Sequence, residues 1–239
     1  MNRELEFVKD MFDSIAPKYD FLNRLLSLRQ DVMWRKEMVK AAHLPDHPLT
    51  LDVACGTCDV ALEIYRQSRA TARVIGVDFS FGMLAKGLEK LGARNRASTI
   101  RSKIRLINGD ALALPFAKDL FDGVFIAFGI RNIMDRQRAI QSFYNVLKPG
   151  RRLAVLELTT PENNVLKALY MLYFKKILPW IGSLFSKNSH AYHYLPDSVI
   201  KFPSSVEFAG IMKQAGFDHV MFKPMTLGIV TLFVGTKKR

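Results

Sequence analysis

The sequence predicts an α/β protein with an open, mostly parallel sheet and helices on both of its faces. Between residues 49 and 158, short apolar runs alternate with amphipathic segments of helical period, which is the pattern of repeated strand–helix units. The first run ends in a tight turn at Gly56, and the next closes on Asp78. Polar residues end most of the predicted strands, and ligands of such sheets bind beyond the carboxyl ends of the strands. We therefore expect a ligand site at that edge.

The chain ahead of the sheet, residues 1–47, is expected to form a helical extension. Apolar residues recur at helical spacing from Phe7 to Ile15, Pro17 interrupts them, and a second amphipathic segment is predicted from Leu25 to Ala42. Between the strands we expect helices from Ser80 to about Leu91 and from Asp135 to Leu147, and a basic loop over Gly92–Ser102. The strands are predicted at Leu49–Ala54, a run ending at Asp78, Ile104–Asn108, Phe121–Phe128 and Arg152–Leu158.

Residues 161–203 are expected to insert a helical cap, and the whole chain, 1–239, to form one domain. Val165–Phe185 is strongly apolar, but Lys175, Lys176 and Pro179 inside it argue against a membrane-spanning helix. A cap helix over an apolar pocket is the plainer interpretation, and an interfacial helix at a membrane is the alternative. A helix over residues 204–215 and two strands over 217–223 and 225–237 follow. The close pairing of these strands predicts that the last one is antiparallel.

Composition limits the kinds of partner. The 35 basic and 22 acidic residues give a net charge of +13, which attracts polyanions or an anionic membrane surface. The basic residues are dispersed without an RNA- or DNA-binding pattern, so no nucleic acid is expected. Cys55 and Cys58 form a C-x-x-C pair with no second pair at metal spacing, so we expect turn residues and no metal site. The first residues are charged and include no apolar leader, which predicts a cytoplasmic protein.

The turn after the first strand differs from that of a nicotinamide dinucleotide site. Such a site has G-x-G-x-x-G, whereas the segment Ala54–Asp59 contains Gly56 alone. A cofactor without a pyrophosphate suits this turn better. The amino-acid end of S-adenosylmethionine needs backbone groups and a nearby carboxylate, for which Asp52 is a candidate. Asp78 would accept hydrogen bonds from the ribose, and Asp110 from the adenine amino group.

Several motifs are spread over nearly the full length of the chain. They are FDSIAPKYDFLNRLLSL (12–28), MWRK (33–36), DVACGTCD (52–59), GDALALPF (109–116), FDGVFIAFGIRN (121–132), VLKPG (146–150) and YHYLPDSVIKFP (192–203), with AGF and GIV near the end. This set resembles the menaquinone/ubiquinone biosynthesis C-methyltransferase family. FGIRN and YDFLN distinguish that family from other methyltransferases.

The resemblance implies a seven-stranded, Rossmann-like fold of the class I S-adenosylmethionine-dependent methyltransferases. It also implies methyl transfer to a ring carbon of a polyprenylated quinol, with a menaquinone precursor favoured and the equivalent ubiquinone precursor as the alternative. The family's cofactor contacts correspond to Thr57, Asp78, Asp110 and Ala111, and the strand and turn add Asp52 and Gly56. The chain departs from the family pattern at Cys58, in a turn that is usually glycine-rich, and at Ala127, where a serine is usual.

A quinol ring carbon becomes nucleophilic when a neighbouring hydroxyl ionises, and we expect it to attack the sulfonium methyl group. Arg131 is the predicted cation that favours the phenolate or orients a water acting as base. Asn132 and Tyr19 are predicted to hold a quinol oxygen. The apolar cap would line the polyprenyl tail, and residues 1–47 would lie on the substrate side. The positive charge would favour peripheral contact with an anionic membrane.

Other functions stay open at this point. An O-methyltransferase would share the cofactor half of the site, and an RNA methyltransferase would account for the charge. A non-catalytic scaffold of quinone biosynthesis would account for the departures at Cys58 and Ala127. Salt-dependent RNA binding and calorimetry with S-adenosylmethionine distinguish these alternatives. A homodimer is also compatible with the sequence.

Overall fold

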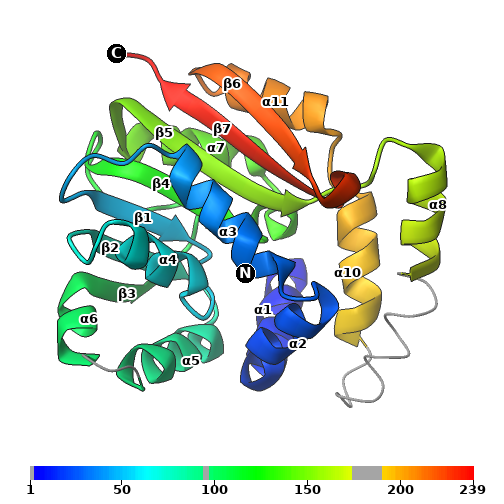
Figure 1. Ribbon diagram of the computed structural model, residues 1–239, viewed down its shortest axis with the longest axis horizontal. Coiled ribbons are helices and arrows are strands. Elements are labelled where there is room, and N and C mark those ends of the chain that lie inside the picture. The colour runs from blue at the N-terminus through cyan, green and yellow to red at the C-terminus, as the bar shows by residue number, and fades with distance from the viewer. Residues whose placement is uncertain (1–2, 94–96, 174–189) are drawn as a thin grey trace.

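The computed structural model describes residues 3–93, 97–173 and 190–239. Its centre is a seven-stranded sheet in the order β3-β2-β1-β4-β5-β7-β6, drawn as arrows in Figure 1. Adjacent strands are parallel except at β7, which runs antiparallel to both β5 and β6. The predicted fold class and the antiparallel last strand are therefore confirmed. The strands are β1 (Leu49–Val53), β2 (Arg73–Asp78), β3 (Ile104–Asn108), β4 (Phe121–Ala127), β5 (Leu147–Leu158), β6 (Phe217–Met225) and β7 (Val230–Lys237).

Helices cover both faces of this sheet. In the described residues they are α1 (Arg3–Ile15), α2 (Tyr19–Leu26), α3 (Gln30–Ala41), α4 (Asp59–Gln67), α5 (Phe81–Gly92), α6 (Ala97–Lys103), α7 (Arg136–Val146), α8 (Asn164–Leu172), α10 (His190–Ile200) and α11 (Ser205–Gln214), with 3-10 turns η1 (Ala16–Lys18), η2 (Ile130–Asn132) and η4 (Thr226–Gly228). In β4, Phe125 packs in one apolar cluster with α3 and α4, and its neighbours Val124 and Ile126 pack in the other with α7 and α11. Burial on both faces explains the continuous apolar strands of the sequence.

The N-terminal extension is divided into more helices than the sequence predicts. The expected helix over Leu25–Ala42 is wrong, because the chain turns between α2 and α3 at Leu28 and Arg29, whose φ angles are 51° and 65°. Neither residue is a glycine or proline, so the sequence carries no ordinary signal for this turn. The break at Pro17 is present as the short turn η1.

Helix α1 is fastened to the sheet domain through the start of α5. Ser80 caps α5 by accepting a hydrogen bond from the Met83 N–H at 3.1 Å, as the sequence predicts. Asp13 of α1 adds to this cap, since its Oδ1 accepts from the Ser80 hydroxyl at 2.5 Å and from the Gly82 N–H at 2.8 Å. An acidic side chain is favourable at a helix N-terminus, so this contact fixes α1 over the carboxyl ends of the first strands.

Two boundaries in the middle of the chain differ from the prediction. The expected loop over Gly92–Ser102 is wrong, because this segment contains α6. Ile100 is buried there while residues 98, 99, 101 and 102 are exposed, which is too little apolar periodicity for the sequence to reveal a helix. Strand β5 begins at Leu147, which pairs with Phe121, rather than at Arg152. The register shift between Phe121 and Gly123 takes up the intervening residues, so the Lys-Pro-Gly segment continues the strand.

The cap region appears in the structure as α8 and α10, at the right of Figure 1. The middle of the predicted cap, including Lys175, Lys176 and Pro179, lies outside the described residues. Tyr170 of α8 and Val199 of α10 form a small apolar cluster with Leu22 of α2. The cap and the N-terminal extension therefore pack against each other. Within the described ranges, no helix combines the length and hydropathy needed to span a bilayer.

Candidate active site

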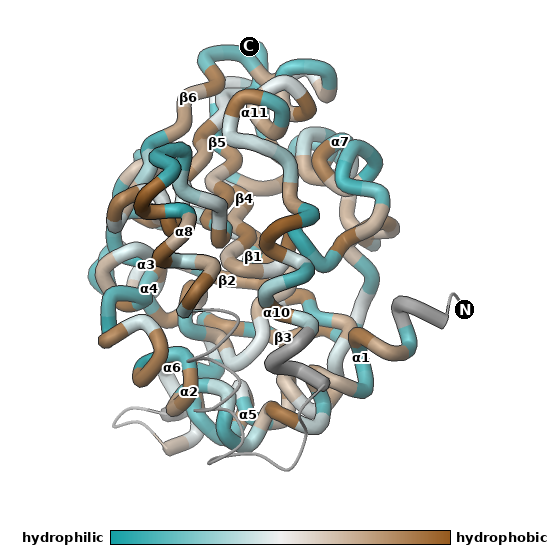
Figure 2. Tube along the Cα trace, turned by 90° about the vertical axis from the view of Figure 1, so that its right-hand side faces the viewer, coloured by the Kyte–Doolittle hydropathy of each residue, from teal (hydrophilic) through white to brown (hydrophobic). Residues whose placement is uncertain are grey.

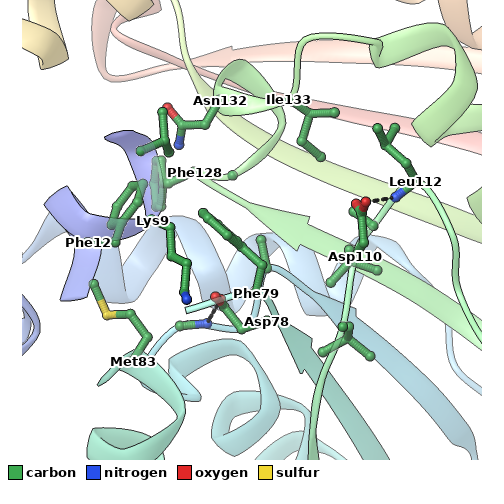
Figure 3. Close-up of a pocket in the computed structure, with 18 of the residues that line it drawn as sticks. Lys9, Phe12, Asp78, Phe79, Met83, Asp110, Leu112, Phe128, Asn132 and Ile133 are labelled. Carbon is green, nitrogen blue, oxygen red and sulfur yellow. Dashed lines mark hydrogen bonds between the residues drawn. The ribbon is translucent and has the colours of Figure 1, made fainter. Parts of the chain in front are cut away.

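A cavity of about 440 Å³ lies at the carboxyl ends of the central strands. Figure 3 shows Asp78 and Asp110 on its sheet side, while Phe12 and Lys9 enter from α1, with Lys9 reaching toward Asp78. The cavity is thus roofed by the N-terminal extension. Six of the predicted site residues line it: Tyr19, Gly56, Asp78, Asp110, Ala111 and Asn132.

The Gly56 turn and Asp78 form one hydrogen-bonded unit. The Asp78 carboxylate accepts from the Gly56 N–H at 2.7 Å through Oδ2 and from the Ser80 N–H at 2.9 Å through Oδ1. Burial raises the pKa of Asp78 to about 6, against the lowering effect of these N–H groups. Gly56 has a φ of 52°, and a Cβ built there would meet nothing within 4 Å. The turn therefore leaves open space beside a carboxylate that accepts hydrogen bonds, which suits a ribose and the adjoining part of a nucleoside cofactor.

Asp110 lies across the cavity from this unit, after β3. Its Oδ1 accepts from the Leu112 N–H at 2.8 Å, which holds the carboxyl in a local turn. The side of the cavity between Asp78 and Asp110 also includes Phe79, Ala111 and Leu112. An apolar slot that ends in a fixed carboxylate is suited to an adenine ring whose amino group donates to that carboxylate.

Asp52, which the sequence places in the cofactor site, lies elsewhere. It does not line the cavity, and its Oδ2 accepts from the Ala61 N–H of α4 at 3.1 Å. Its Oδ1 has no hydrogen-bond partner among the described residues. Burial raises the pKa of Asp52 to about 8, so the carboxyl is protonated at neutral pH. In the structure, Asp52 therefore joins β1 to the first turn of α4.

Thr57 is also turned away from the cavity. Its hydroxyl donates to Asp20 of α2 at 2.5 Å and accepts from Lys90 of α5 at 2.9 Å. Lys90 also contacts Asp59 at 2.9 Å, and Arg24 of α2 contacts the same carboxylate at 2.9 Å. Thr57 therefore belongs to a charged network between the extension and the turn. Burial raises the pKa of Asp59, but the neighbouring cations Arg35, Lys90 and Arg24 outweigh burial and lower this pKa to about 2.

The two cysteines are structural parts of the turn. Both are buried, and they are not joined in a disulfide. Cys58 precedes α4 with a φ of 71°, in the left-handed region. Its sulfur would lie 2.5 Å from a Cβ added at Gly87 of α5. The cysteine thus fills the space that the neighbouring glycine leaves, which explains how the turn tolerates a side chain here.

A second, mostly apolar cavity of about 180 Å³ lies between the extension and the cap. Phe12, Tyr19 and Phe128 line both cavities, so the two spaces adjoin. The walls come from α2, α3, α8, α10 and the η4 region. They include Leu22, Leu26, Trp34, Arg35, Arg131, Tyr170, Tyr173, Tyr194 and Ile229. Helices α2 and α3 contribute more of this wall than α8 and α10 do. The role of residues 161–203 as a cap over a substrate stays a prediction.

Arg131 lines the second cavity as half of a buried ion pair. Its Nη1 donates to Glu157 Oε1 at 2.8 Å and to the Phe128 carbonyl at 2.5 Å, and its backbone N–H donates to Glu157 Oε2 at 3.1 Å. Nε contacts the Ser198 hydroxyl at 3.3 Å. Burial lowers the pKa of Arg131, but the nearby Glu157 carboxylate acts in the opposite direction, and the net result is that the pKa of Arg131 is raised. The guanidinium is therefore permanently charged and tightly oriented.

Asn132 and Tyr19 stand near this arginine at the junction of the cavities. Asn132 Oδ1 accepts from the Tyr194 hydroxyl at 3.1 Å. Burial raises the pKa of Tyr19, while a hydrogen bond with Asn23 and the charge of Arg131 act in the opposite direction. The Tyr19 hydroxyl therefore stays protonated near neutral pH and can donate a hydrogen bond.

Some residues of the site were not identified from the sequence. Glu157 pairs with Arg131 without lining either cavity, and it lies one residue before the end of β5, at the same edge as the other strand-end residues, so its position was a usable signal. Phe12 opens one of the matched motifs, whereas Lys9 carries no local signal and reaches the cavity only because α1 folds over it. Over the described ranges, no group of three or more His, Cys, Asp or Glu side chains is arranged to hold a metal ion.

Solved structures with this fold are numerous and distant in sequence. The [4+2]-cyclase SpnF superposes with a TM-score of 0.70 at 16% identity, covering 97% of this chain and 95% of that one. A methyltransferase from Thermotoga maritima, described as a possible histamine N-methyltransferase, gives a TM-score of 0.64 at 19% identity over 96% of this chain and 99% of that one. These likenesses establish the fold alone.

Curated relatives are much closer. The ubiquinone/menaquinone biosynthesis C-methyltransferase UbiE of Geobacter sulfurreducens is 46% identical over 97% of this chain and 89% of its own length. The demethylmenaquinone methyltransferase of Thermus thermophilus is 41% identical over 95% of this chain and 100% of its own. The model of the ubiE/COQ5 methyltransferase family matches residues 1–237. Because the family model matches nearly the full length of the chain, and the chain has the seven-stranded sheet described above, the chain belongs to the ubiE/COQ5 methyltransferase family.

Proposed function

We propose that this enzyme transfers a methyl group from S-adenosylmethionine to a ring carbon of a polyprenylated quinol, with demethylmenaquinol as the substrate. The observation that carries the proposal is the pair of adjoining cavities, one edged by carboxylates and the other mostly apolar, which share Phe12, Tyr19 and Phe128. A polar nucleoside cofactor and an apolar aromatic substrate can therefore meet at one point. The equivalent ubiquinone precursor is the alternative, since the names of the relatives include both quinones.

The first cavity is assigned to the cofactor. Asp78 would accept from the ribose hydroxyls, the Gly56 turn would face the amino-acid end, and Asp110 with Ala111 would contact the adenine. S-adenosylmethionine supplies an electrophilic methyl group when bound. Asp52 and Thr57 would support this site indirectly, because their hydrogen bonds hold α4 and the turn rather than the cavity wall.

The second cavity is assigned to the quinol. Tyr19 at the junction would donate to a quinol oxygen, and Asn132, fixed by Tyr194, would assist it. The aromatic and aliphatic wall would surround the head group and the first part of the tail. In this assignment residues 1–47 and 161–203 are the substrate-side parts of a single domain, and they exclude water from the reacting atoms.

The reaction requires an ionised quinol hydroxyl next to the reacting carbon. Arg131 would stabilise the phenolate from a fixed position, because Glu157 and the Phe128 carbonyl hold its guanidinium. The ring carbon would then take the methyl group that bound S-adenosylmethionine supplies, with S-adenosylhomocysteine as the leaving group. The ring loses its proton to water and becomes aromatic again. Arg131 is the catalytic residue of this scheme, and Glu157 is its positioning residue.

The substrate tail also suggests where the enzyme works. A polyprenyl chain is held in the bilayer, and the net charge of +13 favours an anionic membrane surface. We assign the enzyme to the cytoplasm, in peripheral contact with the inner face of the membrane.

The test is methyl incorporation from labelled S-adenosylmethionine into short-tail demethylnaphthoquinol and into the matching benzoquinol. The variant Arg131→Lys keeps the buried charge opposite Glu157 but loses the planar fork of donors. We expect cofactor affinity to stay within about twofold and turnover to fall by about a hundredfold. Turnover at the native rate would refute the role of Arg131.

A matched control is Arg136→Lys. Arg136 is half-buried nearby and donates to the Arg131 carbonyl at 3.0 Å, but it does not line either cavity. Its exchange should leave turnover close to native. If neither quinol were methylated although S-adenosylmethionine bound, the proposed substrate would be wrong and the cofactor assignment would survive.

A further inference from the structure

The walls of the quinol cavity are apolar on their outer side as well as on their inner side. In four elements a residue that lines the cavity has a large exposed apolar residue within two positions of it. On the inner side are Leu26, Trp34, Tyr170 and Ile229, and on the outer side Leu25, Met33, Leu169 and Leu227. Of these elements α8 (NVLKALYML) is apolar on nearly all sides, and a helix of that kind normally has apolar surroundings on both sides. The wall of this cavity therefore exposes apolar side chains on its outer surface as well.

Leu227 and a further exposed leucine, Leu28 in the turn between α2 and α3, are held in an unfavourable backbone conformation. Leu28 is 81% exposed with a φ of 51°, and Leu227 is 71% exposed with a φ of 58°. The left-handed region costs a leucine roughly 1 kcal/mol, and asparagine or glycine would occupy it more easily. An exposed leucine adds no burial in return. These positions are thus poorly explained by the stability of the isolated protein and well explained by an external apolar contact.

The two strained turns are tied to each other. Thr226, next to Leu227, donates through its hydroxyl to the side-chain oxygen of Gln30 at 2.6 Å and accepts from the indole N–H of Trp34 at 2.9 Å. Gln30 is the first residue of α3, two positions after Leu28. These bonds join the α2–α3 turn to η4, so both leucines belong to one corner of the molecule.

Helix α8 adds a third part to this surface. Val165, Leu169 and Leu172 are 69%, 58% and 54% exposed and follow the spacing of one helix face. Tyr170 lies toward the quinol cavity. Figure 2 views the molecule from the side of α8 and α10 and shows hydrophobic segments along α8. We call Leu25, Leu28, Met33, Leu169, Leu172 and Leu227 the apolar rim of the quinol cavity.

The charges around the apolar rim are mainly positive. Exposed cations in or next to α2, α3 and α8 are Lys18, Arg29, Lys36, Lys40 and Lys167, and the acidic residues there that reach solvent are Asp20, Glu37 and Glu162. The chain as a whole carries +13. Each exposed cation close to a cytoplasmic leaflet adds about 1 kcal/mol of attraction. An apolar surface bordered by cations suits the headgroup–acyl boundary of an anionic bilayer.

We propose that the apolar rim docks on an anionic lipid bilayer, with Leu28 and Leu227 inserted at the level of the acyl chains. The inference rests on the proposed function, because a polyprenyl tail would then pass from the bilayer directly into the quinol cavity. It assigns membrane contact to the α2–α3 turn, η4 and α8. The surface of the apolar rim is therefore an entrance as well as an anchor.

The test is flotation of the protein with vesicles of phosphatidylcholine alone or mixed with phosphatidylglycerol, without any quinol. The variant is the double exchange Leu28→Asn and Leu227→Asn. Asparagine accepts the left-handed conformation, so we expect an unchanged or higher melting temperature. Binding to the mixed vesicles should fall at least about tenfold, because two leucine insertions are lost. The matched control is Val206→Asn on α11, which is 67% exposed outside the apolar rim and should bind like the native chain.

Activity separates this inference from the proposed function. A short-tail quinol in solution should be methylated equally by the double variant and the native protein, and a long-tail quinol in vesicles more slowly by the variant. Equal vesicle binding by both proteins, or no binding by the native one, would overturn the inference. A native dimer that the double exchange dissociates would also overturn it, since a second copy would then cover the apolar rim. Failure to methylate any quinol, with vesicle binding intact, would count against the function instead.

Discussion

Asp78 offers the sharpest test of the cofactor assignment, because its charge state and its contacts are both defined. Each carboxylate oxygen already accepts one backbone N–H, from Gly56 and from Ser80. Each oxygen keeps a further lone pair for a ribose hydroxyl. The exchange Asp78→Asn preserves the shape and one acceptor but replaces the other with an N–H donor. That donor would face the Gly56 or the Ser80 N–H, so the variant loses charge and weakens the turn.

The size of the effect follows from these contacts. A hydrogen bond to a charged group contributes about 1.5–3 kcal/mol, which corresponds to roughly 10- to 150-fold in affinity. The pKa of Asp78 is raised by burial to about 6, so the acceptor is an anion above that pH and is lost as the pH falls through it. If only the ionised form binds well, the affinity for S-adenosylmethionine should fall by about tenfold between pH 8 and pH 5.

Isothermal titration calorimetry at pH 8, 7, 6 and 5 measures both effects. We expect Asp78→Asn to bind weakly and with little dependence on pH. The control is Asp122→Asn at the other end of the sheet, where the carboxylate accepts from the Leu49 N–H at 3.0 Å and pairs with Lys148. That variant should lose stability and keep its affinity. Native affinity in Asp78→Asn, or a flat pH profile in the native protein, would refute the ribose contact.

Two further predictions concern the support of the site. Because burial raises the pKa of Asp52 to about 8, the folded state binds a proton that the unfolded state releases, and stability falls as pH rises from about 4 to 8. An asparagine at this position cannot ionise, so the free energy of unfolding of Asp52→Asn, measured with urea, should rise relative to that of the native chain by up to about 4 kcal/mol between pH 5 and pH 8. A difference between the two proteins that does not change with pH would contradict a protonated Asp52 carboxyl. Asp13→Ala removes the acceptor of the Ser80 hydroxyl and the Gly82 N–H, so it should cost about 1–2 kcal/mol and speed cofactor release in stopped flow. Release at the native rate would mean that α1 does not retain the cofactor.

The sheet and the position of the site could be predicted because their signals are local. Strand β3 was predicted with its observed bounds, Ile104–Asn108, and β2 with its end at Asp78. A polar residue after an apolar strand identifies the carboxyl edge without knowledge of the rest of the fold. Asp78 and Asp110 follow from this rule, Gly56 follows from the tight turn, and Ala111 follows from the family resemblance; all of them line the first cavity.

The direction in which a side chain points is not a local property. Asp52 and Thr57 sit in the expected strand and turn, yet their partners are Ala61 in α4 and Asp20 in α2. The first contact depends on how α4 leaves the turn, and the second on where an extension 37 residues away in sequence folds back. The turn at Leu28 escaped prediction because neither Leu28 nor Arg29 is a residue type that ordinarily adopts the left-handed conformation.

The arrangement of charges explains why the two cavities can differ so much in polarity while sharing a wall. Helix α2 directs Asp20 and Arg24 toward the cofactor turn, where they meet Thr57 and Asp59, and directs Leu22 and Leu26 into the quinol cavity. The charged network therefore holds the extension against the sheet, and it reaches the apolar space at Asp31 and Arg35, which pair with each other. Arg131 also lines that space, and Glu157 neutralises it at a distance of 2.8 Å. An apolar substrate can thus be desolvated beside a cation whose own cost of burial is already offset. Tyr19 is the first residue of the same short helix, α2, and it lies at the junction because it lines both cavities.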